Sequence, residues 1–174
     1  MFSPLKDRMF RRRLAAETKA GSPRPVNLTQ AKNIIVLFPA DDAADRKAVD
    51  RWRDNFRKTG TKIKFAGYFA QPVGATDFGF ATITLKHLNW YGVPEGEPVD
   101  AYRALECDVL LRLGPADHKE LNYLAATRPA ALKVGPYQPD VVSPYQLQFD
   151  AAPASSLKEQ LAFIEHIFSY TNVQ

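Results

Sequence analysis

Short apolar runs alternate with amphipathic stretches along most of the chain, an arrangement typical of α/β proteins. Residues 33–38 are almost continuously apolar and rich in β-branched side chains, which predicts a parallel strand buried on both faces. Asp41 or Asp42 then caps a helix that reaches about residue 58, and the alternating residues 62–68 predict a second strand. Together these three segments predict a βαβ unit.

The later segments continue this alternation, with one exception near the middle of the chain. Residues 80–85 predict a strand that is reached through a loop with no helix before it, which favours a sheet edge or a hairpin. Ser156 and Glu159 form a capping box for the final helix, whose apolar residues keep to one face. The other expected strands are 109–113, 131–134 and 145–149, and the other expected helices lie near 99–105 and 119–126.

The predicted fold is a three-layer α/β sandwich with a mostly parallel, Rossmann-like or flavodoxin-like sheet of six strands and four helices. We assign residues 31–174 to one α/β domain, because a segment of this length suits a single hydrophobic core. Residues 1–30 are assigned to a basic N-terminal arm and linker. The arm is expected to be helical from Ser3 onward, whereas the prolines in residues 21–28 favour an extended linker.

Charge is distributed unequally between the arm and the body. The first 33 residues hold eight Lys or Arg and two acids, whereas the rest hold fifteen Lys or Arg and seventeen acids. The cations of the arm could contact the phosphates of RNA or the ribosome, and the residues concerned are Arg8, Arg11, Arg12, Arg13, Lys19 and Arg24. Any binding to a polyanion is therefore expected to come from the arm.

Two alternatives for the arm are a solvated tail without a partner and peripheral membrane attachment through its apolar half. Lys6 and Arg13 intrude on that apolar half and argue against attachment. The longest apolar stretch, residues 34–40, falls far short of the ~20 residues that a membrane span needs, so no integral segment is expected. Cys107 is the only cysteine, which fits a reducing compartment, and we expect a cytoplasmic protein.

Two predicted strands end in the same tripeptide, Pro-Ala-Asp, at residues 39–41 and 115–117. In open α/β sheets the ligand crevice lies at the carboxyl ends of strands where the strand order reverses, here expected between these two strands. A polar cluster there could bind a cation or a substrate hydroxyl, and its candidate members are Asp41, Asp42, Asp117 and His118. We favour the simpler alternative, in which proline ends each strand and aspartate caps the next helix. Arg112, close to the same crevice, could bind a carboxylate or phosphate, although a salt-bridged or edge-facing arginine is the favoured alternative.

Several kinds of site are not expected. The first loop has two carboxylates and no glycine, so it would repel a nucleotide phosphate instead of cradling it. His87, His118 and His166 are too far apart in sequence to suggest a metal set. We predict no catalytic residue, metal or cofactor, and the sequence leans against an enzyme without deciding the matter. Trp90 and Tyr91 could stack on a base, although packing against the core is the favoured alternative.

Several short segments, together with the basic helical start, suggest a family. They are Ala-Lys-Asn-Ile at 31–34, Leu-Asn-Trp-Tyr-Gly at 88–92, Cys-Asp-Val-Leu-Leu at 107–111 and Ala-Leu-Lys-Val-Gly at 131–135. The chain resembles a family of uncharacterised proteins from Bacteroidota, which implies a bacterial cytoplasmic protein. The family has no established activity, so the resemblance carries over no catalytic residues. The favoured hypothesis is a non-catalytic protein whose arm contacts RNA or ribonucleoprotein. The alternative is a small-molecule-binding domain or enzyme that uses the crevice.

Overall fold

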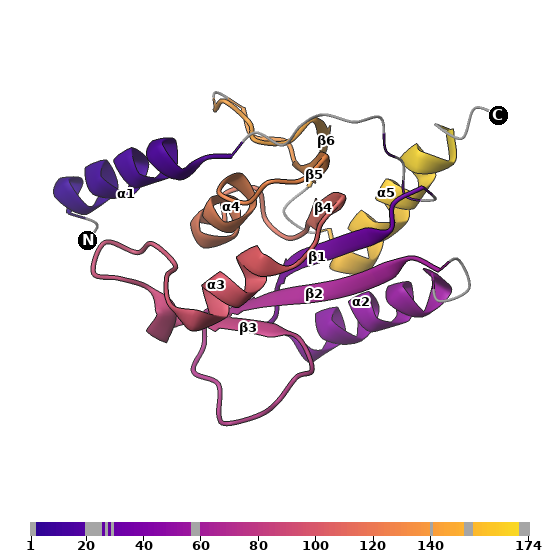
Figure 1. Ribbon diagram of the computed structural model, residues 1–174, viewed down its shortest axis with the longest axis horizontal. Coiled ribbons are helices and arrows are strands. Elements are labelled where there is room, and N and C mark those ends of the chain that lie inside the picture. Colours follow the sequence, from indigo (N-terminus) through magenta and orange to yellow (C-terminus); the bar gives the residue numbers. More distant parts are fainter. Residues whose placement is uncertain are drawn as a thin grey trace.

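A parallel sheet of six strands forms the centre of the molecule (Figure 1). The computed structural model describes residues 3–19, 26, 28, 30–56, 60–139, 141–151 and 155–170. Within them the strand order is β3-β2-β1-β4-β5-β6, and every neighbouring pair is parallel. The strands are β1 Asn33–Pro39, β2 Lys62–Phe69, β3 Ala81–Thr84, β4 Val109–Arg112, β5 Leu132–Pro136 and β6 Leu147–Phe149. The predicted α/β class and parallel sheet are confirmed.

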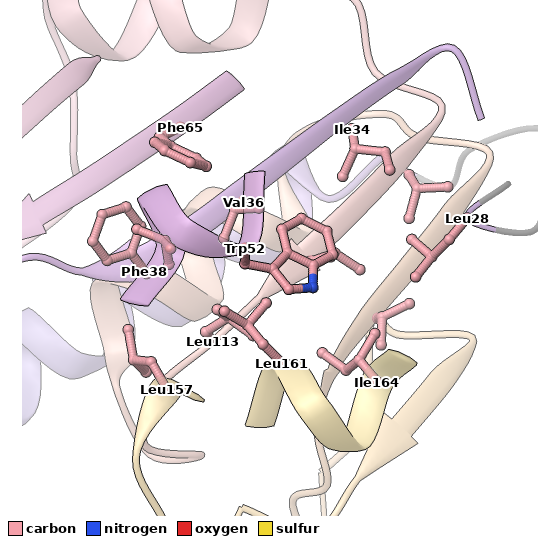
Figure 2. Close-up of a cluster of buried hydrophobic side chains, with 14 of the residues drawn as sticks. Leu28, Ile34, Val36, Phe38, Trp52, Phe65, Leu113, Leu157, Leu161 and Ile164 are labelled. Atoms are coloured by element: carbon pink, nitrogen blue, oxygen red, sulfur yellow. The ribbon is translucent and has the colours of Figure 1, made fainter. Parts of the chain in front are cut away.

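Helices cover both faces of the sheet, giving the three predicted layers (Figure 1). The described residues contain five α-helices, which are α1 Pro4–Glu17, α2 Ala43–Phe56, α3 Glu97–Ala104, α4 Lys119–Ala126 and α5 Leu157–Tyr170. Alternate residues of β1 divide between the layers, since Ile34 and Val36 pack towards α2 and α5 whereas Ile35 and Leu37 pack towards α3 and α4. Figure 2 shows Trp52 of α2 and Leu161 of α5 meeting the first of these two faces.

β3 lies at a sheet edge, as predicted, but it runs parallel to β2 and forms no hairpin. The loop that connects β2 to β3 contains no helix, and its aromatic side chains pack against the sheet instead. Phe78 lies 4.9 Å from Phe69 and Phe80 lies 5.7 Å from Phe38, measured between ring centroids. A Cβ at Gly67 would come within 2.6 Å of the Phe80 ring, so glycine is required for the loop to lie this close to β2.

The ends of the helices follow the predicted capping in part. Ser156 and Glu159 form the expected capping box, because the Ser156 N–H donates to the Glu159 carboxylate at 2.7 Å and the Glu159 N–H donates to Ser156 Oγ at 3.2 Å. Ser3 occupies the N-cap of α1, yet its side chain makes no capping hydrogen bond. The end predicted for the second helix, near residue 58, lies outside the described residues, and α2 ends at Phe56.

Candidate functional site

The two Pro-Ala-Asp loops open into one cleft of about 610 Å³ at the point where the strand order reverses between β1 and β4. The residues preceding α5 and its first turn complete the lining. Gly114 allows the two loops to meet, because its φ of +101° suits glycine and an added Cβ would lie 2.7 Å from Pro39. The cleft lies between the two strands where the sequence placed the ligand crevice, and its use by a ligand stays a prediction.

The aspartates of the first loop bind backbone groups. Asp41 accepts hydrogen bonds from the N–H groups of Ala70 at 3.0 Å and Gln71 at 2.9 Å, which ties the end of β1 to the end of β2. Asp42 accepts from the Ala44 N–H at 2.7 Å and so caps α2. Asp41 lines the cleft, and both carboxylates have a structural function in the fold.

Arg112 is fully buried beneath the second loop. Its guanidinium donates to the carbonyls of Gly114 at 3.0 Å and His118 at 3.3 Å, while Nε has no hydrogen-bond partner. Burial lowers the pKa of this guanidinium, since no carboxylate bonds to it among the described residues. Arg112 is absent from the cleft lining, so it holds the loop that follows β4 in place and does not face a ligand.

Gln160 is a cleft residue that was not among the candidates predicted from the sequence. Its side chain is 4% exposed, accepts from the Gly114 N–H at 2.8 Å and donates to Ser155 Oγ at 3.2 Å. It therefore links α5 to the loop after β4. The sequence did contain an indication of this contact. Gln160 lies on the apolar face of the final helix, between Leu157 and Leu161, where a buried glutamine needs hydrogen-bond partners.

The rim of the cleft is acidic. Asp117 is exposed, and the His118 ring lies edge-on to Tyr68 with its Nδ1 3.3 Å from the Glu120 carboxylate. Burial opposes ionisation of Glu120, but the adjacent His118 ring and the charge of Lys119 lower its pKa. Asp45 also lines the cleft, and burial together with the charge of Asp42 raises its pKa. Among the described residues, no three His, Cys, Asp or Glu side chains are placed to hold a metal ion.

The predicted arm forms helix α1, which packs against α4 (Figure 1). Phe10 is 4% exposed, and its ring lies 5.5 Å from that of Tyr123 and 4.2 Å from Lys119 Nζ. After the helix, the Lys19 N–H donates to the Ala126 carbonyl at 2.9 Å, and Lys133 Nζ donates to the Lys19 carbonyl at 2.8 Å. The helix is therefore docked along its length.

Docking separates the charges of α1. Its two acids face the body, because Asp7 pairs with Lys119 at 3.2 Å and Glu17 pairs with Arg103 at 3.5 Å and hydrogen-bonds Tyr123. The side chains predicted to contact phosphate are exposed at Arg8, Arg11, Arg12, Arg13 and Lys19, and Arg24 lies outside the described residues. Arg13 is also paired with Glu17. The outer face of the helix is consequently cationic.

Residues 88–92 form a compact turn beside the N-terminal half of α1. The polar atoms of the Asn89 side chain are occupied by intramolecular hydrogen bonds. Its Oδ1 accepts from the N–H groups of Tyr91 and Val93, and its Nδ2 donates to Glu95. Trp90 is 57% exposed, whereas Tyr91 is half-buried against the cluster of Phe10, Val93 and Tyr123. Core packing therefore accounts for Tyr91 but not for Trp90.

A family model described as a family of unknown function, DUF6913, matches residues 6–173, a span that includes α1 as well as the α/β body. Comparison with curated proteins and with solved structures gave no match. Among the described residues, none of the helices has the length and apolarity to cross a membrane.

Proposed function

We propose that this chain, which belongs to the family of unknown function DUF6913, is a non-catalytic protein that binds RNA or ribonucleoprotein through the outer face of α1. The proposal depends on one observation, the separation of charge on that helix. Asp7 and Glu17 are paired with the body, and Arg8, Arg11 and Arg12 are exposed together on the other side. A surface of this kind suits the phosphates of a nucleic acid.

The setting in this proposal is the bacterial cytoplasm, where RNA and ribosomes are accessible. Cys107 is the only cysteine of the chain, so no internal disulfide can form, which fits a reducing compartment. The acidic cleft supports the assignment of RNA contacts to α1, since Asp41, Asp45 and Asp117 would repel phosphate there.

The test compares two double charge reversals of equal size. We expect Arg8→Glu with Arg12→Glu to weaken binding of a structured RNA about tenfold or more at 50 mM salt, because two phosphate contacts become repulsive. Binding is measured by fluorescence anisotropy of a labelled RNA hairpin at 50 and 200 mM salt. The wild-type affinity should fall steeply between the two salt concentrations.

The matched control is Lys47→Glu with Lys158→Glu, which makes the same change of charge on exposed residues of α2 and α5. These helices cover the face of the sheet opposite α4, where α1 docks. The control should retain most of the affinity. Equal losses in the two variants would indicate a general effect of net charge, and unchanged binding in the α1 variant would contradict the proposal.

A second candidate function is binding of a small molecule at the cleft. It is favoured by one observation, the meeting of both Pro-Ala-Asp loops and the start of α5 around a single space at the switch point. The exposed Asp117 and the hydroxyls of Ser155 and Ser156 suit a ligand rich in hydroxyl or amino groups. Thermal-shift screening of sugars, polyamines and divalent ions tests this candidate function. If none of these compounds raises the melting temperature, the proposed binding at the cleft is wrong.

Peripheral membrane attachment through the apolar half of the arm is the least supported alternative. Phe10 and Leu14, on which attachment would depend, pack against Tyr123 and Val93, which leaves Leu5 as the exposed large apolar residue of the helix. Flotation with anionic liposomes distinguishes this alternative from RNA binding, because attachment would carry the chain to the lipid fraction.

A further inference from the structure

A groove of about 300 Å³ lies between the start of α1 and the turn at residues 88–92. The lining includes Lys6 from α1, Trp90 and Tyr91 from the turn, and Lys119 and Glu120 from α4. Figure 1 shows the connection from β3 to α3 passing beside the N-terminal end of α1. An exposed indole and two lysines are thus brought together from three separate parts of the chain.

The turn that carries Trp90 is held firmly. The Asn89 N–H donates to the Val93 carbonyl at 3.0 Å, and the Gly92 N–H donates to the Asn89 carbonyl at 2.9 Å. Gly92 has a φ of +87°, which closes the turn, and Leu88 bridges Pro94 behind it. The Trp90 ring also meets the Tyr91 ring edge to face at a centroid distance of 5.2 Å. A planar ligand would therefore find a preorganised indole.

We propose that this groove binds one unpaired base of a single-stranded RNA, which stacks on Trp90 while Lys6 contacts a flanking phosphate. The inference rests on the proposed RNA-binding function of α1 and names the kind of RNA. A volume of about 300 Å³ is at the lower limit for ligand sites and suits a single nucleoside. Base faces are available for stacking in single strands and loops, whereas a duplex keeps them covered.

Lys6 is the groove residue that supplies positive charge for a flanking phosphate. It is exposed and lines the groove, and it belongs to the same helix as the outward-facing Arg8 and Arg12. Lys119 is paired with Asp7 and lies over the Phe10 ring, which makes it part of the groove wall. Glu120 is the acid in the lining, and its partner is His118.

The test measures binding of the full chain to a labelled 12-nucleotide single-stranded RNA and to a duplex of the same length. The wild type should prefer the single strand. Trp90→Ala should weaken single-strand binding about tenfold, as expected for loss of one base–aromatic stack, and should change duplex binding less than twofold. Trp90→Phe should restore most of the affinity because it retains an aromatic face.

The variants are expected to fold, since Trp90 is 57% exposed, and an unchanged melting temperature checks this. Intrinsic fluorescence gives a second readout. Trp52 is 5% exposed and provides a constant background, so quenching by the single strand should disappear in Trp90→Ala.

The outcomes separate this inference from the function on which it rests. If Trp90→Ala binds the single strand as tightly as the wild type while Arg8→Glu with Arg12→Glu does not, the stacking groove is wrong and RNA binding by α1 stands. If the wild type binds neither RNA at 50 mM salt, both proposals are overturned. Tighter binding to single-stranded DNA, or binding to anionic vesicles alone, would overturn RNA as the partner.

Discussion

At the residue scale, Lys133 couples the body to the end of α1. Its side chain is 1% exposed, and its ammonium donates to the carbonyls of Lys19 at 2.8 Å and Ala126 at 3.2 Å. Burial lowers the pKa of Lys133 from 10.5 to about 8. The fold therefore holds a cation that has carbonyl partners and no bonded carboxylate among the described residues.

This lowered pKa predicts how stability depends on pH. Between pH 8 and 10.5 the unfolded chain binds the Lys133 proton more tightly than the folded chain, so the contribution of Lys133 to the unfolding free energy rises with pH. Lys133→Met keeps the apolar part of the side chain and removes the charge. Below pH 8 its unfolding free energy should exceed that of the wild type, and this excess should shrink towards pH 10. Urea unfolding at pH 7 to 10 measures this difference.

Lys64→Met is the control, because Lys64 also belongs to a strand but is exposed. This variant shows how loss of one exposed lysine charge changes the unfolding free energy, and the Lys133→Met result is compared with it at each pH. Other groups titrate in this range, and comparison of variants at each pH removes their shared contribution. If the difference in unfolding free energy between Lys133→Met and wild type does not change with pH, the lowered pKa of Lys133 is wrong.

At the element scale, the strands and helices of the body were predictable because each is specified by its own residues. β1 is buried along most of its length and is continuously apolar, and α5 has both a capping box and an apolar face. The direction of β3 was not predictable, because it depends on Phe78 and Phe80 of the preceding loop packing against Phe38 and Phe69. Contacts between residues far apart in sequence leave no local pattern.

The docking of α1 gives the prediction at this scale. Phe10→Ala should weaken docking by up to about 3 kcal/mol, because it removes a ring packed on Tyr123 and Val93. Hydrogen exchange should then speed up in the amides of α1 while those of β1 and β4 stay protected. Leu5→Ala is the control, since Leu5 is 58% exposed. Faster exchange in both variants, or in neither, would show that Phe10 does not hold the helix.

At the scale of the whole molecule, the sequence placed the candidate crevice between β1 and β4 but did not show how its side chains bond. Both Pro-Ala-Asp loops reach one cleft because parallel strands place their carboxyl ends at the same edge. The bonds of Asp41 to the end of β2 and of Arg112 to loop carbonyls depend on side-chain packing that the sequence does not encode locally. The groove at Trp90 could not be predicted from the sequence either, because it forms only when α1 is docked beside residues 88–92.

The docking of α1 also predicts that deletion of the arm lowers the stability of the body. A chain lacking residues 1–19 would leave Tyr123 and Val93 uncovered and would remove the Lys19 carbonyl from the Lys133 ammonium. We expect a lower melting temperature and a greater tendency to aggregate, because apolar surface and a buried cation lose their partners. Arg8→Glu with Arg12→Glu changes exposed residues and should keep the wild-type melting temperature. Scanning calorimetry of the two variants compares them directly, and equal melting temperatures for the deletion and the wild type would contradict a docked α1.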